Sequence, residues 1–306
     1  MDTKEFQNAK NEMQLLVIGA SGYIGSHIYS EAKKRNINVV GTMCEARQSE
    51  LVKFNIKFDN ISDVINKIDA NGNKYVIICS AISAIDSCFV QYKHAYDINV
   101  TSTIRLLDQL NKQGFKSVFL SSDNVFDGES GYYTEDDVPK PINKYGQMKA
   151  EVEKYILTNH SNDCIMRISK IIGDKPHAKN IFTQWQKSLI EQKEIACIKN
   201  QIFSPTDVMD IVNCFFIVIE RNLSGLYNVC NAENFERFEL AYQFIKKYNP
   251  KTTLTNSPLD TFNFMDSRPL KTYMSNDRFV KKTGYHFENV NNIIKNYWLN
   301  QGYMCE

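Results

Sequence analysis

The sequence has no excess of charge of either sign. It contains 36 Lys and Arg residues against 35 Asp and Glu residues, which gives a formal net charge of +1. A strongly basic surface is the usual signature of a protein that binds nucleic acid or an anionic membrane. We therefore expect neither nucleic acid nor a membrane as a partner of this chain.

Disulfide and metal-ligand patterns are also missing. The eight cysteines lie far apart, none belongs to a C-x-x-C pair, and no His lies at ligand spacing from them. Several lie inside apolar runs, such as Cys79 in YVIICSA. Free, buried thiols in a reducing compartment are therefore expected, and we assign no metal site.

Long hydrophobic runs are absent as well. The longest apolar stretch, Ile211–Ile219, is too short to span a bilayer. Residues 1–12 form a polar N-terminal extension that lacks the apolar core of a signal peptide. These features predict a soluble, cytoplasmic protein.

What the sequence does contain is a regular alternation of short apolar runs and amphipathic stretches. With 306 residues, 43% of them hydrophobic, the chain can bury a sizeable core. The expected strands are 15–18, 39–41, 75–80, 118–121 and 164–168, and the expected helical stretches are 23–35, 61–68, 89–112 and 144–157. Strands that alternate with helices predict an α/β fold, a doubly wound parallel sheet of the Rossmann type.

The alternation of short apolar runs and amphipathic stretches becomes less regular after Gly173. Helical patterns here surround short extended pieces, at 181–192, 207–221, 235–248 and 287–301. We therefore expect a dinucleotide-binding domain at 13–172, completed by about 200–232, and a smaller C-terminal α/β part at 173–306 that binds substrate.

The segment GASGYIG follows the first expected strand and opens the first helix. Its three glycines have G-x-x-G-x-x-G spacing. Such a turn lets the backbone approach a pyrophosphate, which then lies on the amides of the helix N-terminus. The cofactor contacts predicted here are Gly19, Ser21, Gly22, Tyr23, Ile24 and Gly25.

The end of the second strand bears on the choice of cofactor. NAD-binding folds usually place an Asp or Glu there to bind the ribose hydroxyls. This chain has Gly41 and Thr42 at that place, with Glu45 and Arg47 a little beyond, and we predict that Thr42 and Arg47 contact the cofactor. The missing acid and the nearby Arg47 favour a 2′-phosphate, hence NADP(H), while NAD(H) and a surface role for Arg47 stay open.

The segment SVFLSSDNVFDG, 117–128, carries polar residues directly after a buried strand. In a doubly wound sheet, ligands bind at the C-terminal ends of the strands. This strand therefore places Ser121 or Ser122 at the cofactor cleft, where a hydroxyl can hydrogen-bond a reacting oxygen.

Downstream, Tyr145 and Lys149 share one face of an expected helix at i, i+4 spacing. An ammonium beside a phenol favours the phenolate, so this tyrosine can exchange a proton with a carbonyl or hydroxyl oxygen.

Together these motifs resemble the extended short-chain dehydrogenase/reductases, and within them the dTDP-4-dehydrorhamnose reductase family. The resemblance covers nearly the whole chain, from about Leu15 onward. It rests on GASGYIG, SSDNVFDG and YGQMK (145–149), and it continues in RISKIIG (167–173), QIFSPTDVMD (201–210), GLYNVCNAE (225–233) and RPLKTYMSNDRF (268–279).

The resemblance implies an NAD(P)H-dependent reductase of a nucleotide-linked 4-keto-6-deoxy sugar, an enzyme of deoxysugar and polysaccharide biosynthesis. Hydride would go to the C4 ketone, Tyr145 would protonate the oxygen, Ser122 would polarise the carbonyl and Lys149 would hold the nicotinamide ribose. Further cofactor contacts implied are Ser80, Ala81, Asn99, Tyr145 and Lys149. The substrate contacts implied are Ser121, Asp123, Asn124 and Arg268. Members of the superfamily are often dimers, so the resemblance is compatible with a homodimer and leaves the oligomeric state open.

Departures from the family pattern keep alternatives open. Asn124 stands where the family has Tyr, and the segment CSAISAIDSC, 79–88, lacks the motif that the family usually has there. Because Asn124 cannot act as a base, dehydration is disfavoured. Two alternatives remain. One is an epimerase or reductase of a different nucleotide sugar. The other is a non-catalytic NADP-binding protein that resembles the regulatory subunit of methionine adenosyltransferase.

Overall fold

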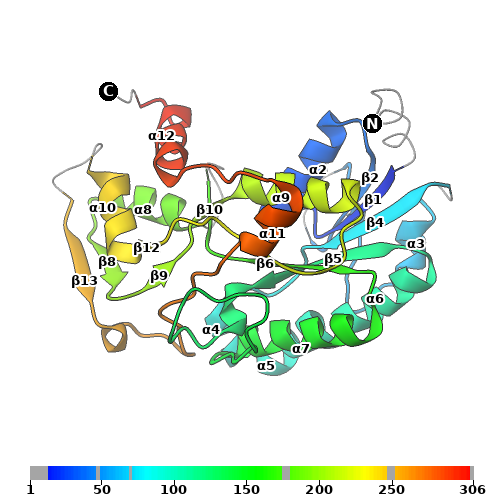
Figure 1. Ribbon diagram of the computed structural model, residues 1–306, viewed down its shortest axis with the longest axis horizontal. Helices are drawn as coiled ribbons and strands as arrows, with labels where there is room; N and C mark the ends of the chain where they lie inside the picture. Colours follow the sequence, from blue (N-terminus) through cyan, green and yellow to red (C-terminus); the bar gives the residue numbers. More distant parts are fainter. Residues whose placement is uncertain (1–12, 46–48, 69–70, 174–179, 247–251, 304–306) are drawn as a thin grey trace. The chain divides into compact units, whose positions relative to one another are not determined.

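The computed structural model describes residues 13–45, 49–68, 71–173, 180–246 and 252–303 (Figure 1). They form two compact units. The first unit takes in the described residues of 1–121, 147–166 and 215–226, and the second those of 122–146, 167–214 and 227–306. The chain passes between the units several times, so neither is one continuous segment. The domain boundary expected after residue 172 stays a prediction.

The first unit is built on a seven-stranded sheet with the order β11-β6-β5-β4-β1-β2-β3. The strands are β1 (Met13–Ile18), β2 (Asn38–Met43), β3 (Val52–Lys53), β4 (Asn73–Ile78), β5 (Lys116–Ser122), β6 (Cys164–Ile168) and β11 (Gly225–Val229). β1 pairs in parallel with both β2 and β4. The chain therefore proceeds outward on one side of β1 and then returns to its other side. Such a switch point is where ligands bind in doubly wound sheets.

The sheet is buried because its strands are apolar on both faces, as parallel strands covered by helices must be. All six residues of β1 are buried. Figure 1 shows helices of this unit against the sheet. Their bounds are α2 (Tyr23–Lys34), α3 (Ser62–Ile65), α4 (Ile85–Val90), α5 (Tyr92–Tyr96), the π-helix η1 (Asp97–Ser102), α6 (Thr103–Lys112) and α7 (Lys144–Asn159), of which the first three residues of α7 belong to the second unit.

The second unit has three two-stranded sheets and a separate core. Its centre is aromatic, with Phe182, Trp185, Phe244, Tyr297 and Trp298 all buried. The elements not yet introduced are η2 (Asp123–Val125), β7 (Ile171–Ile172), α8 (Ile181–Ile190), β8 (Ile195–Ile198), β9 (Ile202–Phe203), β10 (Thr206–Asp207), α9 (Val208–Glu220), β12 (Phe235–Glu236), α10 (Arg237–Ile245), β13 (Leu254–Ser257), η3 (Leu259–Thr261), α11 (Asp277–Thr283) and α12 (Val290–Asn300). None of the helices in the described residues is long and apolar enough to cross a membrane.

The predicted doubly wound parallel sheet is confirmed, and each expected strand lies within a strand or at its end. One helical expectation needs correction, because the stretch 61–68 is helical only at Ser62–Ile65. The stretch 89–112 is mainly helical, as expected, and within it the π-helix η1 separates α5 from α6. Apolar periodicity cannot distinguish a π-turn from α-helix over six residues.

Candidate active site

The glycine turn follows β1 in the first unit and leads into α2. Gly19 has a φ of +87°, which favours glycine, and a Cβ there would lie 2.9 Å from the backbone nitrogen of Ser80. A Cβ on Gly25 would lie 2.3 Å from the carbonyl oxygen of Gly19. Both positions therefore require glycine. Ser21 and Gly22 are exposed, while Tyr23 and Ile24 are half-buried. The turn thus presents bare backbone at the start of a helix, as a dinucleotide site needs.

We expect Gly25→Ala to disrupt this turn and Gly22→Ala to leave its fold intact. A methyl group on Gly25 would collide with the Gly19 backbone, which should lower the free energy of unfolding by about 1–3 kcal/mol. At Gly22 the nearest atom to a Cβ would be the Gly19 carbonyl oxygen at 3.3 Å, a tight contact that a small shift relieves, and φ is −75°, so alanine should cost much less there than at Gly25. Denaturant unfolding and NADPH titration of both variants check this. Loss of NADPH affinity without loss of stability in Gly22→Ala would indicate close backbone approach by the cofactor. Unchanged stability in Gly25→Ala would contradict the packing.

Thr42, predicted to contact the cofactor, holds the glycine turn. It is 1% exposed, and its hydroxyl accepts a hydrogen bond from the Gly19 amide at 3.0 Å. Its carbonyl accepts from the Ala20 amide at 2.8 Å. Thr42 therefore ties β2 to the turn. Arg47 lies outside the described residues.

The loop after β4 contains Ser80 and Ala81, both partly exposed next to the glycine turn. Asn99, buried in the π-helix η1, braces this loop. Its side-chain oxygen accepts from the Ile82 amide and its nitrogen donates to the Ile82 carbonyl, both at 2.8 Å. Both amide atoms of Asn99 thus bind this loop backbone, and the residue fixes the loop that carries two predicted cofactor contacts.

The C-terminal end of β5 and the residues after it carry four buried or half-buried polar residues. Ser121 is 1% exposed and its hydroxyl has no hydrogen-bond partner among the described residues. Ser122 is 7% exposed, and its hydroxyl donates to Asp123 Oδ1 at 3.0 Å. The backbone and side-chain nitrogens of Asn124 each lie 3.2 Å from Ser122 Oγ. Asp123 Oδ2 accepts from Ser169 at 3.3 Å. Ser122 is thus held by three groups.

Tyr145 lies in the first turn of α7. Asn143 immediately precedes this helix, and its side-chain oxygen accepts from the Gly146 amide at 2.8 Å. Such an N-cap contributes about 1 kcal/mol to helix stability. A Cβ on Gly146 would lie 1.9 Å from the carbonyl oxygen of Asn124, so only glycine lets the helix start this close to η2. These contacts fix the backbone on both sides of Tyr145, whose side chain is half-buried.

Lys149 lies one helical turn after Tyr145 on α7 and belongs to the first unit. Its side chain is buried, its Nζ donates to the carbonyl oxygen of Leu120 at 2.7 Å, and Nζ is 4.5 Å from the centre of the Phe119 ring. Burial lowers the pKa of Lys149 to about 8, although the charge of Glu153 opposes this shift. The lysine is therefore tied to the strand that ends in the two serines.

Arg268 lies in a loop of the second unit that is bonded to the start of α7. Asp266 accepts from the Lys144 amide at 2.7 Å, and Arg268 donates to the Asp266 carbonyl at 3.0 Å. The guanidinium lies 4.3 Å from the centre of the Phe264 ring. Arg268 is half-buried.

The structure therefore joins the predicted residues in two sets. In the first unit, the glycine turn adjoins Ser80 and is held by Thr42. In the second unit, hydrogen bonds connect Ser122, Asp123 and Asn124 to the start of α7, to which the loop of Arg268 is also bonded. Tyr145 and Lys149 are one turn apart on α7.

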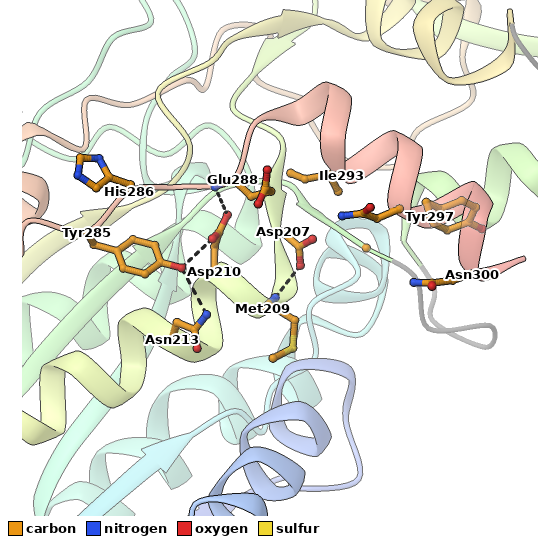
Figure 2. Close-up of a pocket in the computed structure, with 12 residues that line it drawn as sticks. Asp207, Met209, Asp210, Asn213, Tyr285, His286, Glu288, Ile293, Tyr297 and Asn300 are labelled. Carbon is orange, nitrogen blue, oxygen red and sulfur yellow. Dashed lines mark hydrogen bonds between the residues drawn. The ribbon is translucent and has the colours of Figure 1, made fainter. Parts of the chain in front are cut away.

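A cavity of about 400 Å³ lies in the second unit (Figure 2). Figure 2 shows Asp210 at its wall, where it accepts from Tyr285 Oη at 2.7 Å and from the Glu288 amide at 3.1 Å. Burial raises the pKa of Asp210. None of the predicted site residues lines this cavity, and its borders include Gly173, next to residues outside the description. We therefore place the chemistry elsewhere.

The sequence interpretation missed Asn143, Asp266 and Ser169. Asn143 could have been found, because Asn directly before a helical pattern is an N-cap signature. Asp266 and Ser169 are distant in sequence from the groups they bind, so local spacing gave no signal for them.

The family model described as RmlD substrate binding domain matches residues 13–301. The chain belongs to this family. The resemblance predicted from the motifs is thereby confirmed.

Individual relatives of this RmlD-family chain differ in their described roles. It is 26% identical over 262 residues to methionine adenosyltransferase 2 subunit beta of Rattus norvegicus, covering 80% of this chain and 76% of the relative. It is 24% identical over 298 residues to the spore coat polysaccharide biosynthesis protein SpsK of Bacillus subtilis, and the match covers 96% of this chain and 99% of the relative. The dTDP-4-dehydrorhamnose reductase of Bacillus anthracis, solved in complex with NADP, has a TM-score of 0.82 at 23% identity and covers 95% and 99% of the two chains. That structure supports the fold.

Proposed function

We propose that this chain is an NAD(P)H-dependent reductase of a nucleotide-linked 4-keto-6-deoxy sugar. The observation that carries the proposal is the hydrogen-bonded connection between Ser122, at the end of β5, and the backbone on both sides of Tyr145, at the start of α7. A hydroxyl and a phenol held on rigid elements are what carbonyl reduction requires, because donors misplaced by about 1 Å can lose on the order of 10²-fold in rate.

Each proposed catalytic residue has one task. Ser122 donates a hydrogen bond to the ketone oxygen, and Tyr145 gives that oxygen a proton as it becomes the hydroxyl. The tyrosine then recovers a proton from solvent. Lys149 remains mostly charged at neutral pH, since its pKa is about 8, and its charge favours the phenolate that this transfer leaves.

The glycine turn fits a dinucleotide. Side chains at Gly19 and Gly25 would fill the space at the turn, and the exposed Ser21 and Gly22 leave backbone at the helix start accessible. Reduced nicotinamide supplies the hydride when it is bound. We propose NADP(H) as the favoured cofactor, because no Asp or Glu ends β2 and Thr42 is occupied with the turn. The proposal also includes the cytoplasmic location and the homodimer that were expected from the sequence and the family resemblance.

Reduction is favoured over dehydration by Asn124. A carboxylate there could take a proton from carbon, but a carboxamide cannot. The side chain of Asn124 is also engaged with Ser122, Asp123 and Asn143. The substrate contacts Ser121, Asp123, Asn124 and Arg268 remain part of the proposal, and a different nucleotide sugar remains open.

A second candidate is a regulatory, non-catalytic role. The observation that favours it is the similarity to methionine adenosyltransferase 2 subunit beta. A protein of this kind would bind the dinucleotide without turning over any sugar and would contact a protein partner.

Consumption of NADPH or NADH with a panel of nucleotide-linked 4-keto sugars separates these roles. The reductase should consume cofactor only when a keto sugar is present, and the panel should show which nucleotide it accepts. An epimerase would isomerise the sugar with no net consumption of cofactor. Cofactor binding without turnover of any member would overturn the reductase and favour the regulatory role.

A further inference from the structure

A chain of hydrogen bonds leads from the backbone of α7 to the hydroxyl of Ser122. Asn143 Oδ1 accepts from the Gly146 amide at 2.8 Å, and Asn143 Nδ2 lies 3.0 Å from Asn124 Oδ1. Asn124 Nδ2 lies 3.2 Å from Ser122 Oγ and 2.9 Å from Asp123 Oδ1. All five residues belong to the second unit.

The Gly146 amide fixes the orientation of both carboxamides. A backbone N–H can only donate, so the atom of Asn143 that meets it is the oxygen, and the nitrogen of Asn143 faces Asn124. The facing atom of Asn124 must then be its oxygen. Its two side-chain N–H groups therefore point to Ser122 and Asp123. The assignment follows from one backbone donor.

This orientation determines what the Ser122 hydroxyl can do. A hydroxyl has two acceptor positions and one proton to donate. The backbone and side-chain N–H groups of Asn124 occupy both acceptor positions. Ser122 Oγ donates its proton to Asp123 Oδ1 at 3.0 Å, an oxygen that also accepts from Asn124, while Asp123 Oδ2 accepts from Ser169. Ser122 can thus only donate, and a substrate oxygen would take the place of Asp123 Oδ1 as its acceptor.

We propose that Asn124 is a positioning residue that holds Ser122 as a hydrogen-bond donor toward the reacting oxygen of the substrate, through the relay Gly146–Asn143–Asn124–Ser122. This inference rests on the proposed reductase activity. The relay also couples Ser122 to the backbone next to Tyr145, so that the two groups acting on one oxygen are aligned by the same hydrogen bonds.

Asn124→Asp and Asn124→Ala distinguish this role from space filling. Aspartate has the same shape but no N–H, so its carboxylate would accept the Ser122 proton, and we expect kcat to fall about 100-fold. Alanine removes the side-chain donor and leaves the backbone N–H of residue 124. We therefore expect kcat of Asn124→Ala to fall about tenfold. KM should change little in both. If Asn124 only filled space, alanine would be the more damaging change. That order would overturn the proposal.

The pH profile gives a second readout. In Asn124→Asp the introduced carboxylate would lie beside Asp123, and two adjacent carboxylates share a proton at higher pH than one alone. The other titratable groups coupled to Asp123 are Lys170 and Cys230. Protonation of the pair weakens its pull on the Ser122 proton, so kcat of Asn124→Asp relative to the unaltered protein should recover partly as pH falls. A pH-independent ratio would contradict the relay.

Asn111→Asp is the matched control. Asn111 Nδ2 donates to Asp163 Oδ2 at 3.0 Å, so the substitution also pairs two carboxylates, but in the first unit. Asn111→Asp should lower the free energy of unfolding. The ratio of its kcat to that of the unaltered protein should not depend on pH.

Amide hydrogen exchange at Gly146 tests the relay without turnover. Asn124→Ala should speed this exchange about tenfold, the equivalent of one hydrogen bond, because Asn143 loses its partner. Asn111→Ala should leave it unchanged. Absence of turnover in the unaltered protein would overturn the proposed reductase. The relay would then be tested by the exchange of the Gly146 amide alone, and unchanged exchange in Asn124→Ala would overturn the relay.

Discussion

Tyr145→Phe should lower turnover of a nucleotide-linked keto sugar by about 10²–10⁴-fold, the range that positioned proton donors contribute. The substitution removes one hydroxyl. The backbone around it is fixed by the Asn143 cap and by the close approach of Gly146 to Asn124, so the ring should keep its place. NADPH affinity should therefore change little. Steady-state kinetics together with NADPH titration measure both effects.

Tyr155→Phe is the matched control for this result. Tyr155 lies on the same helix, and its hydroxyl donates to Asp108 Oδ1 at 2.7 Å. Its loss should cost some stability and leave turnover unchanged. If Tyr145→Phe retained the turnover of the Tyr155→Phe variant, Tyr145 would not be the proton donor.

Lys149 should make stability rise with pH above about 8. Burial lowers its pKa from 10.5 to about 8, so below pH 8 the folded state carries a buried charge at full cost. Between pH 8 and 10.5 the folded protein releases this proton while the unfolded chain keeps it, and the cost disappears. Relative to Lys149→Met, the unaltered protein should therefore gain about 3 kcal/mol of unfolding free energy across this window. Denaturant unfolding at a series of pH values measures the difference.

Lys154→Met controls for the loss of a lysine from the same helix. Lys154 is exposed, so Lys154→Met removes a lysine from the same helix without removing a buried charge. Lys149→Met should also reduce turnover, because the variant lacks the charge that we propose favours the Tyr145 phenolate. A constant stability difference for Lys149→Met would show that the lysine is solvated in the folded protein.

The parts of the site that were predictable from sequence are those with local spacing. The glycines of 19–25 and the Y-x-x-x-K pair each lie in one turn or one helix, and the strand before Ser122 is marked by its apolar run. Their positions at the ends of β1 and β5 and at the start of α7 follow from the alternation of strands and helices.

The contacts that hold those residues were not predictable, because they join segments distant in sequence. We predicted from the sequence that Thr42 contacts the cofactor, but its hydroxyl accepts a hydrogen bond from the Gly19 amide. We predicted the same of Asn99, yet its side-chain oxygen and nitrogen both bind the loop backbone at Ile82. Asn124 read as a departure from the family pattern, and only the structure shows that it links Asn143 to Ser122. Two-residue strands such as β7 and β10 are too short to leave a periodic pattern.

Transfer of deuterium from nicotinamide to sugar tests the central proposal most directly. The protein is incubated with NADPH deuterated at the transferred position of C4 and with a nucleotide-linked 4-keto-6-deoxy sugar, and the product is examined by mass spectrometry and NMR. The proposed mechanism predicts one deuterium at C4 of the reduced sugar, absent when Tyr145→Phe replaces the unaltered protein. Recovery of unlabelled sugar and unoxidised cofactor, with the cofactor still bound, would contradict it.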